Sequence, residues 1–158
     1  MAKHNVIFTK DNEYYTPKEF VRLFGNFDYD PATTKEKAIE FVIEHFDTIE
    51  TDGLKADWTK YKRIWINPPF TIKHEFLKKA VETYKNVKNE IYILVPIEFL
   101  TTKRFHTIMD KINYLLYIPN KRIVFESGLN KKLSHTSFGT VIIKIHTLPF
   151  SGIKHIEI

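Results

Sequence analysis

Two kinds of hydrophobic pattern divide this chain into predicted helices and strands. Apolar residues recur every three to four positions, which is typical of amphipathic helices, over residues 17–24, 35–46, 73–85 and 103–109. Short apolar or alternating runs instead predict strands over residues 26–30, 63–66, 91–95, 113–118 and 139–145. Strands and helices therefore alternate through most of the chain.

This order of elements predicts the fold class. Alternating strands and helices favour a three-layer α/β sandwich with a mainly parallel sheet, and we expect the strand at 139–145, near the C-terminus, to be antiparallel. No internal repeat or Gly/Ser-rich linker interrupts the pattern. Residues 1–158 are therefore expected to form a single domain with one sizeable core.

The most informative motif, Asn67-Pro68-Pro69-Phe70, follows a predicted buried strand. Neither proline can donate to a sheet, so the strand ends here, at the edge where open α/β sheets bind their ligands. The Asn67 side-chain oxygen and the Pro68 carbonyl could each accept one hydrogen of a conjugated amine and turn its lone pair towards a methyl sulfonium. Phe70 would stack on the planar substrate, while the prolines hold the acceptors in place. Alternatively, the motif merely ends a strand and opens a turn.

A threonine and a proline precede the first predicted helix. Thr16 occupies the position of an N-cap, with Pro17 as the first helical residue and Glu19 at capping-box distance. We expect Gly25 to end this helix. A helix N-terminus with a threonine hydroxyl is also suited to bind a carboxylate, and the two roles are compatible.

Three acidic residues are candidates for contacts with the methyl donor. Asp30 follows a predicted strand and precedes a helix, as in nucleotide-binding α/β units, but the glycine-rich fingerprint is missing and an ordinary β–α turn explains it equally well. Asp52 lies in an Asp-Gly turn signal. Asp57 could accept an adenine amino group while Trp58 lies against the ring, although Trp58 could equally belong to the core.

Basic residues flank an aromatic residue in the segment 120–132. Lys121, Arg122 and Lys131 could bind phosphates, and Phe125 could contact an extruded base, although a solvated loop explains the segment equally well. The net charge of +5 also favours a polyanionic partner.

Composition excludes several classes of protein. The sequence has no cysteine, which excludes disulfides and thiolate chemistry and is consistent with a reducing cytoplasm. Residues 1–10 lack the apolar core of a signal peptide, and no apolar run is long enough to cross a bilayer. Because the apolar runs are short, we expect no membrane partner. The histidines are scattered without metal-ligand spacing, so we expect no metal site.

Five segments occur in the order seen in one known family: Tyr15-Thr16-Pro17, residues 28–32, residues 52–58, the Asn-Pro-Pro-Phe motif and residues 122–125. Over residues 14–145 the chain resembles the small phage-type, Dam-like DNA N6-adenine methyltransferases. This resemblance implies a Rossmann-like methyltransferase fold, S-adenosyl-L-methionine as cofactor, and DNA as partner, from which the target adenine is flipped.

The resemblance also implies a role for each candidate residue. The catalytic residues would be Asn67, Pro68, Pro69 and Phe70. The cofactor-binding residues would be Tyr15, Thr16, Pro17, Asp30, Asp52, Asp57 and Trp58. The substrate-binding residues would be Lys121, Arg122, Phe125 and Lys131.

Several alternatives stay open. Phe70 stands where tyrosine is commoner, the loop after Asp30 lacks glycines, and the segment before Asn67 is short for the usual number of strands. The motifs determine neither the acid that binds the ribose, nor the target sequence, nor whether the protein is a monomer or a homodimer. An RNA adenine, a cytosine or a glutamine would present a similar amine, and a nucleic-acid-binding module with a decayed cofactor site is another candidate. The expected location is the cytoplasm of a bacterium or of a phage-infected cell.

Overall fold

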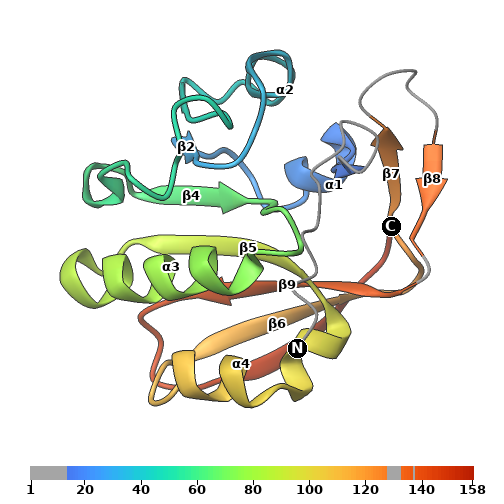
Figure 1. Cartoon of the computed structure of the whole chain (residues 1–158). Helices are drawn as coiled ribbons and strands as arrows, with labels where there is room; N and C mark the ends of the chain where they lie inside the picture. The colour runs from blue at the N-terminus through green and yellow to red at the C-terminus, as the bar shows by residue number, and fades with distance from the viewer. Residues whose placement is uncertain (1–13, 128–132, 137) are drawn as a thin grey trace, which may run out of the picture.

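The computed structural model describes residues 14–127, 133–136 and 138–158. Its centre is a seven-stranded sheet with the strand order β10-β6-β9-β5-β4-β2-β3 (Figure 1). These strands are β2 (Tyr29–Asp30), β3 (His45–Phe46), β4 (Arg63–Ile66), β5 (Glu90–Pro96), β6 (Tyr114–Pro119), β9 (Thr140–Ile145) and β10 (Gly152–Ile156). Neighbouring strands are parallel except for the two pairs that β9 makes, with β5 and β6. The predicted mainly parallel sheet with an antiparallel strand is therefore confirmed.

Helices lie on both faces of this sheet. The α-helices are α1 (Lys18–Arg22), α2 (Lys35–Phe41), α3 (Lys73–Val87) and α4 (Lys103–Ile108), with short 3-10 helices η2 (Trp58–Lys60) and η3 (Ile97–Thr101). The two that cover the first face are α3 and α4. Because side chains alternate along a strand, Ile64 and Ile66 of β4 share one core cluster with Phe76 and Leu77 of α3. The same cluster includes Phe105 of α4, so α3 and α4 form one outer layer (Figure 1).

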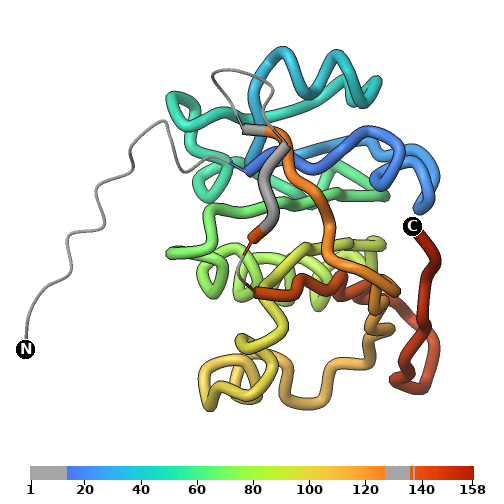
Figure 2. The backbone as a smooth tube through the Cα atoms, turned by 90° about the vertical axis from the view of Figure 1, so that its right-hand side faces the viewer, coloured from blue at the N-terminus to red at the C-terminus, as the bar shows by residue number. Residues whose placement is uncertain are grey.

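The opposite face is covered by α1 and by a small second sheet. This antiparallel sheet has the order β1-β7-β8 and consists of β1 (Tyr14–Tyr15), β7 (Val124–Ser127) and β8 (Leu133–His135). Trp65, which points to the other side of β4, packs in a second core cluster with Phe20 of α1, Phe24 just after that helix and Phe125 of β7. Figure 2 shows β7 running past the ends of the central strands towards α2. The third layer is thus part helix and part sheet.

Several elements differ from the sequence-based predictions. The helix predicted over residues 35–46 ends at Phe41, because Val42 adopts a left-handed conformation with φ of 60°. The Ile43 backbone N–H then donates to the Ala38 carbonyl at 2.9 Å, and the chain continues into β3. The hairpin strands β7 and β8 and the edge strand β10 were not predicted, since their patterns are short and largely polar.

The start of β4 is anchored on both sides, which fixes the strand that carries the Asn-Pro-Pro-Phe motif. The Asp28 carboxylate accepts hydrogen bonds from the backbone N–H groups of Lys62 and Arg63, both at 3.0 Å. Arg63 in turn donates from Nε to Glu90 of β5 at 2.9 Å. The motif therefore emerges from a strand with a fixed position in the sheet.

Candidate active site

The side-chain amide of Asn67 lies at the carboxyl end of β4 with a defined orientation. Its Nδ2 donates a hydrogen bond to the Tyr14 carbonyl of β1 at 2.7 Å. Because the nitrogen is committed to this bond, Oδ1 is the end of the amide that is available to a ligand. Within the described part of the chain, no hydrogen bond to Oδ1 is formed.

The backbone that follows offers a second free acceptor. The Pro69 carbonyl accepts from the Ile72 N–H at 3.0 Å, and the Phe70 carbonyl accepts from the Lys73 Nζ at 2.8 Å. Among the described residues nothing donates to the carbonyl of Pro68, a residue that is buried as a whole. The carbonyl groups of Pro69 and Phe70 therefore hold the loop in place, while the Pro68 carbonyl and Asn67 Oδ1 remain as two neighbouring acceptors.

Aromatic rings surround Phe70. The Tyr14 ring lies nearly parallel to it, with centroids 6.3 Å apart and an angle of 16° between the planes. Phe138, just before β9, contacts Phe70 edge to face at 5.4 Å. Neither Tyr14 nor Phe138 was predicted as a site residue, because each reaches Phe70 only through the folded chain and neither belongs to a recognisable motif. Together these rings form an aromatic environment beside the two acceptors.

The structure contradicts the predicted N-cap. Helix α1 begins at Lys18 with Pro17 as its N-cap, and no side chain caps it. The Pro17 carbonyl accepts from the N–H groups of Phe20 and Val21 instead. Thr16 is only 2 % exposed, and its Oγ1 has no hydrogen-bond partner among the residues that the structure describes. A buried hydroxyl without a partner is unfavourable, so Thr16 is a polar group suited to a ligand rather than a helix cap.

Two acidic residues lie at the carboxyl ends of neighbouring parallel strands. Asp30 ends β2 and is only 2 % exposed, and its carboxylate accepts a hydrogen bond from the Ala32 N–H at 2.9 Å. This hydrogen bond lowers the pKa of Asp30, but burial has the larger effect and raises the pKa to about 7. Asp47 follows β3, and its N–H donates to the Asp30 carbonyl at 2.9 Å. Its carboxylate accepts a hydrogen bond from the Tyr29 hydroxyl. Sequence analysis missed Asp47, because the preceding residues were assigned to a helix.

The turn that contains Asp52 packs directly on the loop after β2. The Asp52 backbone has a left-handed conformation, with φ of 56°. Its carboxylate forms an ion pair with Lys55 at 2.9 Å, and the hydrogen bond within this pair lowers the pKa of Asp52. A Cβ added at Gly53 would lie 2.0 Å from the Pro31 carbonyl oxygen, so only glycine fits there. Asp52 therefore lies near the segment that carries Asp30.

The structure places Trp58 and Asp57 in structural roles. Trp58 is 1 % exposed, packs against Tyr29 and donates from its indole N–H to the Gly53 carbonyl at 2.8 Å. It belongs to the core and is not available to lie against a cofactor ring. Asp57 accepts from the Thr59 N–H at 3.0 Å and from its hydroxyl, which lowers its pKa. It thus caps η2, before the start of β4 and at the opposite end of that strand from Asn67.

A groove of about 580 Å³ lies between residues 54–59 and the outer side of α3. Asp57, Lys79 and Glu82 are among its lining residues. Neither Asn67 nor any residue of β1 lines it, so we do not assign the groove to the candidate active site.

The basic segment is part of the small sheet and not a loop throughout. Lys121 and Arg122 are exposed, and the Arg122 guanidinium donates to the Thr136 carbonyl at 3.2 Å. Phe125 is 0 % exposed and contacts Tyr14 at 5.9 Å, so it is a core residue and not a contact for an extruded base. Lys131 lies outside the described residues.

The described residues contain neither a metal-ligand cluster nor a membrane-spanning helix. Within residues 14–127, 133–136 and 138–158, no group of three or more His, Cys, Asp or Glu side chains is arranged to hold a metal ion. In the same part of the chain, no helix has both the length and the apolar character needed to cross a membrane.

Comparisons with known proteins agree with the resemblance found in the sequence. A family model described as DNA N-6-adenine-methyltransferase (Dam) matches residues 8–153. The chain is 36% identical over 87 residues to the DNA N-6-adenine-methyltransferase of Escherichia phage T1; the alignment covers 52% of this chain but only 35% of the phage protein. A solved structure from Agrobacterium tumefaciens, described as a predicted O-methyltransferase, is similar with a TM-score of 0.42 and 6% identity, over 82% of this chain and 65% of that one.

Proposed function

Since the chain belongs to the DNA N-6-adenine-methyltransferase (Dam) family, we propose that it methylates the N6 amine of adenine in DNA, with S-adenosyl-L-methionine as the methyl donor. The single observation that carries this proposal is the pair of free acceptors at the end of β4. Among the described residues no donor reaches Asn67 Oδ1 or the Pro68 carbonyl, whereas Asn67 Nδ2 and the carbonyls of Pro69 and Phe70 each have a hydrogen-bond partner.

Two acceptors suit this amine because it has two hydrogens. The adenine N6 lone pair is delocalised into the ring, so the free amine is a weak nucleophile. Hydrogen bonds to Asn67 Oδ1 and to the Pro68 carbonyl would hold the nitrogen closer to a tetrahedral geometry. Both bonds strengthen as positive charge develops on the nitrogen, which stabilises the transition state more than the ground state. The hydrogen bond from Asn67 Nδ2 to Tyr14 keeps Oδ1 in place for this role.

The rings beside the acceptors suit a flipped purine. Phe70 contacts Tyr14 and Phe138, so a base that enters must separate Phe70 from one of these rings and replace that contact with its own. Flipping is required because an amine within a base pair is already hydrogen-bonded and out of reach. The exposed side chains of Lys121 and Arg122 would contact the DNA phosphates. The net charge of +5 would add a long-range attraction to DNA.

The residues near β1 and β2 fit S-adenosyl-L-methionine, which supplies an electrophilic methyl group on a sulfonium when bound. The unpartnered Thr16 hydroxyl would hydrogen-bond the carboxylate of the methionine part, next to Tyr15 and Pro17. Asp30 would accept from the ammonium group, which would lower its raised pKa. Asp47, at the end of the neighbouring strand, is the acid that we assign to the ribose hydroxyls, and Asp52 lies on the same side.

Labelled S-adenosyl-L-methionine and DNA of varied sequence test this function directly. We expect label in N6-methyladenine, whereas the absence of labelled N6-methyladenine on every DNA would contradict the proposal. Competition with RNA and with protein substrates identifies a different acceptor, such as cytosine or glutamine, if the label appears there instead. Binding of DNA without any affinity for S-adenosylhomocysteine would show a nucleic-acid-binding module with a decayed cofactor site.

Substitution of Asn67 tests the role of its side-chain oxygen. Asn67→Ala should lower kcat by about a hundredfold or more, the usual loss when one transition-state hydrogen bond is removed. Its affinity for S-adenosylhomocysteine in calorimetry should stay close to that of the parent. A variant with unchanged kcat would contradict the assignment.

A further inference from the structure

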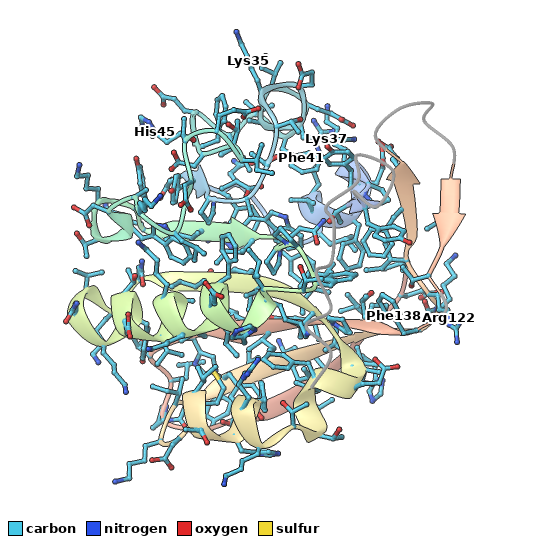
Figure 3. The ribbon with its side chains drawn as sticks, viewed as in Figure 1. Lys35, Lys37, Phe41, His45, Arg122 and Phe138 are labelled. Atoms are coloured by element: carbon cyan, nitrogen blue, oxygen red, sulfur yellow. The ribbon has the colours of Figure 1, made fainter. Side chains whose placement is uncertain are left out.

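Lys37 joins three elements that are far apart in the sequence. Its ammonium group forms ion pairs with Glu40 of the same helix at 2.8 Å and with Glu126 of β7, 89 positions away. It also lies 5.7 Å from the centre of the Tyr15 ring of β1 and 5.8 Å from that of Phe41. Figure 3 shows Lys37 and Phe41 on the side of α2 near α1 and β7, whereas Lys35 extends away from the protein.

This lysine is well shielded and firmly charged. Its side chain is only 12 % exposed, so its ion pairs are screened by solvent less than those of a surface residue. Burial by itself lowers the pKa of Lys37, but the hydrogen bonds to Glu126 and Glu40 outweigh burial and raise the pKa above its ordinary value. The side chain therefore remains a cation throughout the neutral range.

Strand β1, whose Tyr15 ring Lys37 contacts, lies beside both parts of the candidate active site. β1 consists of two residues and pairs with β7, with Tyr15 opposite Glu126. The Tyr14 carbonyl of β1 accepts the hydrogen bond that orients the Asn67 amide. Thr16, with its unpartnered hydroxyl, follows directly. A shift of β1 would thus move an acceptor for the target amine and a group for the cofactor together.

We propose that Lys37 is a positioning residue, which clamps β1 between α2 and β7 and thereby keeps Asn67 and Thr16 in register with each other. This inference rests on the proposed function and adds the residue that aligns the two reactants. A strand of two residues pairs with its neighbour over a short length, so side-chain contacts on its flanks add to what fixes its position. Methyl transfer depends on alignment, and small displacements of reacting groups are costly.

Lys37→Met tests the clamp, because methionine retains an apolar stem against the two rings and removes the charge. Calorimetry should show an affinity for S-adenosylhomocysteine about tenfold weaker than that of the parent, a typical loss for one partly buried charged contact. The kcat should also fall about tenfold, with little change in the KM for DNA. Lys35→Met is the matched control: Lys35 is exposed on the same helix, so both quantities should stay at the parent values.

A double-mutant cycle with Glu126→Gln separates the clamp from general damage to the fold. Each single variant should be impaired, and the double variant should be no worse than Lys37→Met, because both substitutions break the same contact. Additive effects would overturn the proposal. So would a Lys37→Met variant that is less stable to urea but has unchanged affinity and kcat, since Lys37 would then be merely structural.

Different results would contradict the proposed methyltransferase function and the proposed role of Lys37. If the parent protein produces no N6-methyladenine, the proposed function fails, whereas the calorimetric comparison of Lys37→Met with Lys35→Met still tests the clamp. If the parent methylates adenine and Lys37→Met matches it in affinity and kcat, the clamp alone is wrong.

Discussion

At the scale of single residues, the candidate site is marked by polar groups whose hydrogen bonds are incomplete. In the described part of the chain, the Asn67 side chain forms a hydrogen bond only through its nitrogen, and neither the Pro68 carbonyl nor the Thr16 hydroxyl has a hydrogen-bond partner. Buried polar groups in proteins are nearly always satisfied, and each exception destabilises the fold by about 1–3 kcal/mol. Such groups clustered at one sheet edge are expected where a ligand completes the hydrogen bonds.

The Thr16 hydroxyl should therefore have opposite effects on stability and on binding. Thr16→Val removes a buried unpartnered hydroxyl, so the free energy of unfolding should rise by about 1 kcal/mol without cofactor. The affinity for S-adenosylhomocysteine should fall about tenfold, because a hydrogen bond to the ligand is lost. Urea unfolding and calorimetry measure the two effects, with Thr16→Ser as the control that retains the hydroxyl. A variant that loses stability would contradict this account.

Asp30 should make the stability of the protein depend on pH. Burial raises its pKa from 3.8 to about 7, so Asp30 favours the folded state most below about pH 3.8, and this contribution is lost as the pH rises to about 7. Asp30→Asn is neutral at every pH and should gain stability relative to the parent over this interval. Urea unfolding at about pH 4.5, 6 and 8 tests this. An equal difference between the two proteins at all three values would show that the carboxyl is not shifted.

At the scale of elements, very short elements position the site. Strand β1 has two residues and provides the carbonyl that orients Asn67, and Thr16 lies between β1 and the five-residue helix α1. Their positions depend on neighbours: β7 pairs with β1, and Phe20 of α1 packs in the same core cluster as Trp65. In the same way, the turn at Gly53 packs on Pro31, next to Asp30.

This last contact predicts the effect of adding one methyl group. Gly53→Ala would place its Cβ 2.0 Å from the Pro31 carbonyl oxygen, which forces the two loops apart. We expect a loss of about 1–3 kcal/mol in the free energy of unfolding, typical of overpacking. Gly139→Ala is the matched control, because its Cβ would meet only the Ile97 side chain at 3.6 Å. Thermal unfolding of both variants provides the comparison, and equal midpoints would contradict the predicted clash.

At the scale of the whole molecule, charge and topology combine. The carboxyl ends of the parallel strands place Asp30, Asp47 and Asn67 at one edge of the sheet, as is general for open α/β folds. The small sheet, with the exposed Lys121 and Arg122 just before β7, lies on the same side (Figure 2). A net charge of +5 makes long-range attraction to DNA part of binding.

The affinity for DNA should therefore fall as the salt concentration rises, and the steepness of this fall should depend on Lys121 and Arg122. If each contacts a phosphate, Lys121→Ala and Arg122→Ala should each reduce the slope of log affinity against log salt by about 1. Affinity for S-adenosylhomocysteine should not change. Lys85→Ala, an exposed position near the far end of α3, is the control and should leave the slope as in the parent. Slopes that are identical in all four proteins would place the DNA elsewhere.

The sequence by itself determined the features that rest on local chemistry. Apolar runs identified β4, β5 and β9, because buried strands need continuous β-branched and aromatic residues. The Asn-Pro-Pro-Phe motif showed where β4 ends and which two acceptors follow, since prolines stop a strand wherever it is placed. The ordered motifs also indicated the family.

Only the tertiary structure decided which residues meet. Thr16 looked like a helix cap and proved to be an unpartnered hydroxyl, while Trp58 and Phe125 looked like ligand contacts and proved to be core residues. Tyr14, Asp47 and Phe138 entered the site without any sequence signal. The physical reason is that burial and hydrogen-bond partners are set by contacts between segments distant in sequence, as when Lys37 meets Glu126, and no local pattern encodes such contacts.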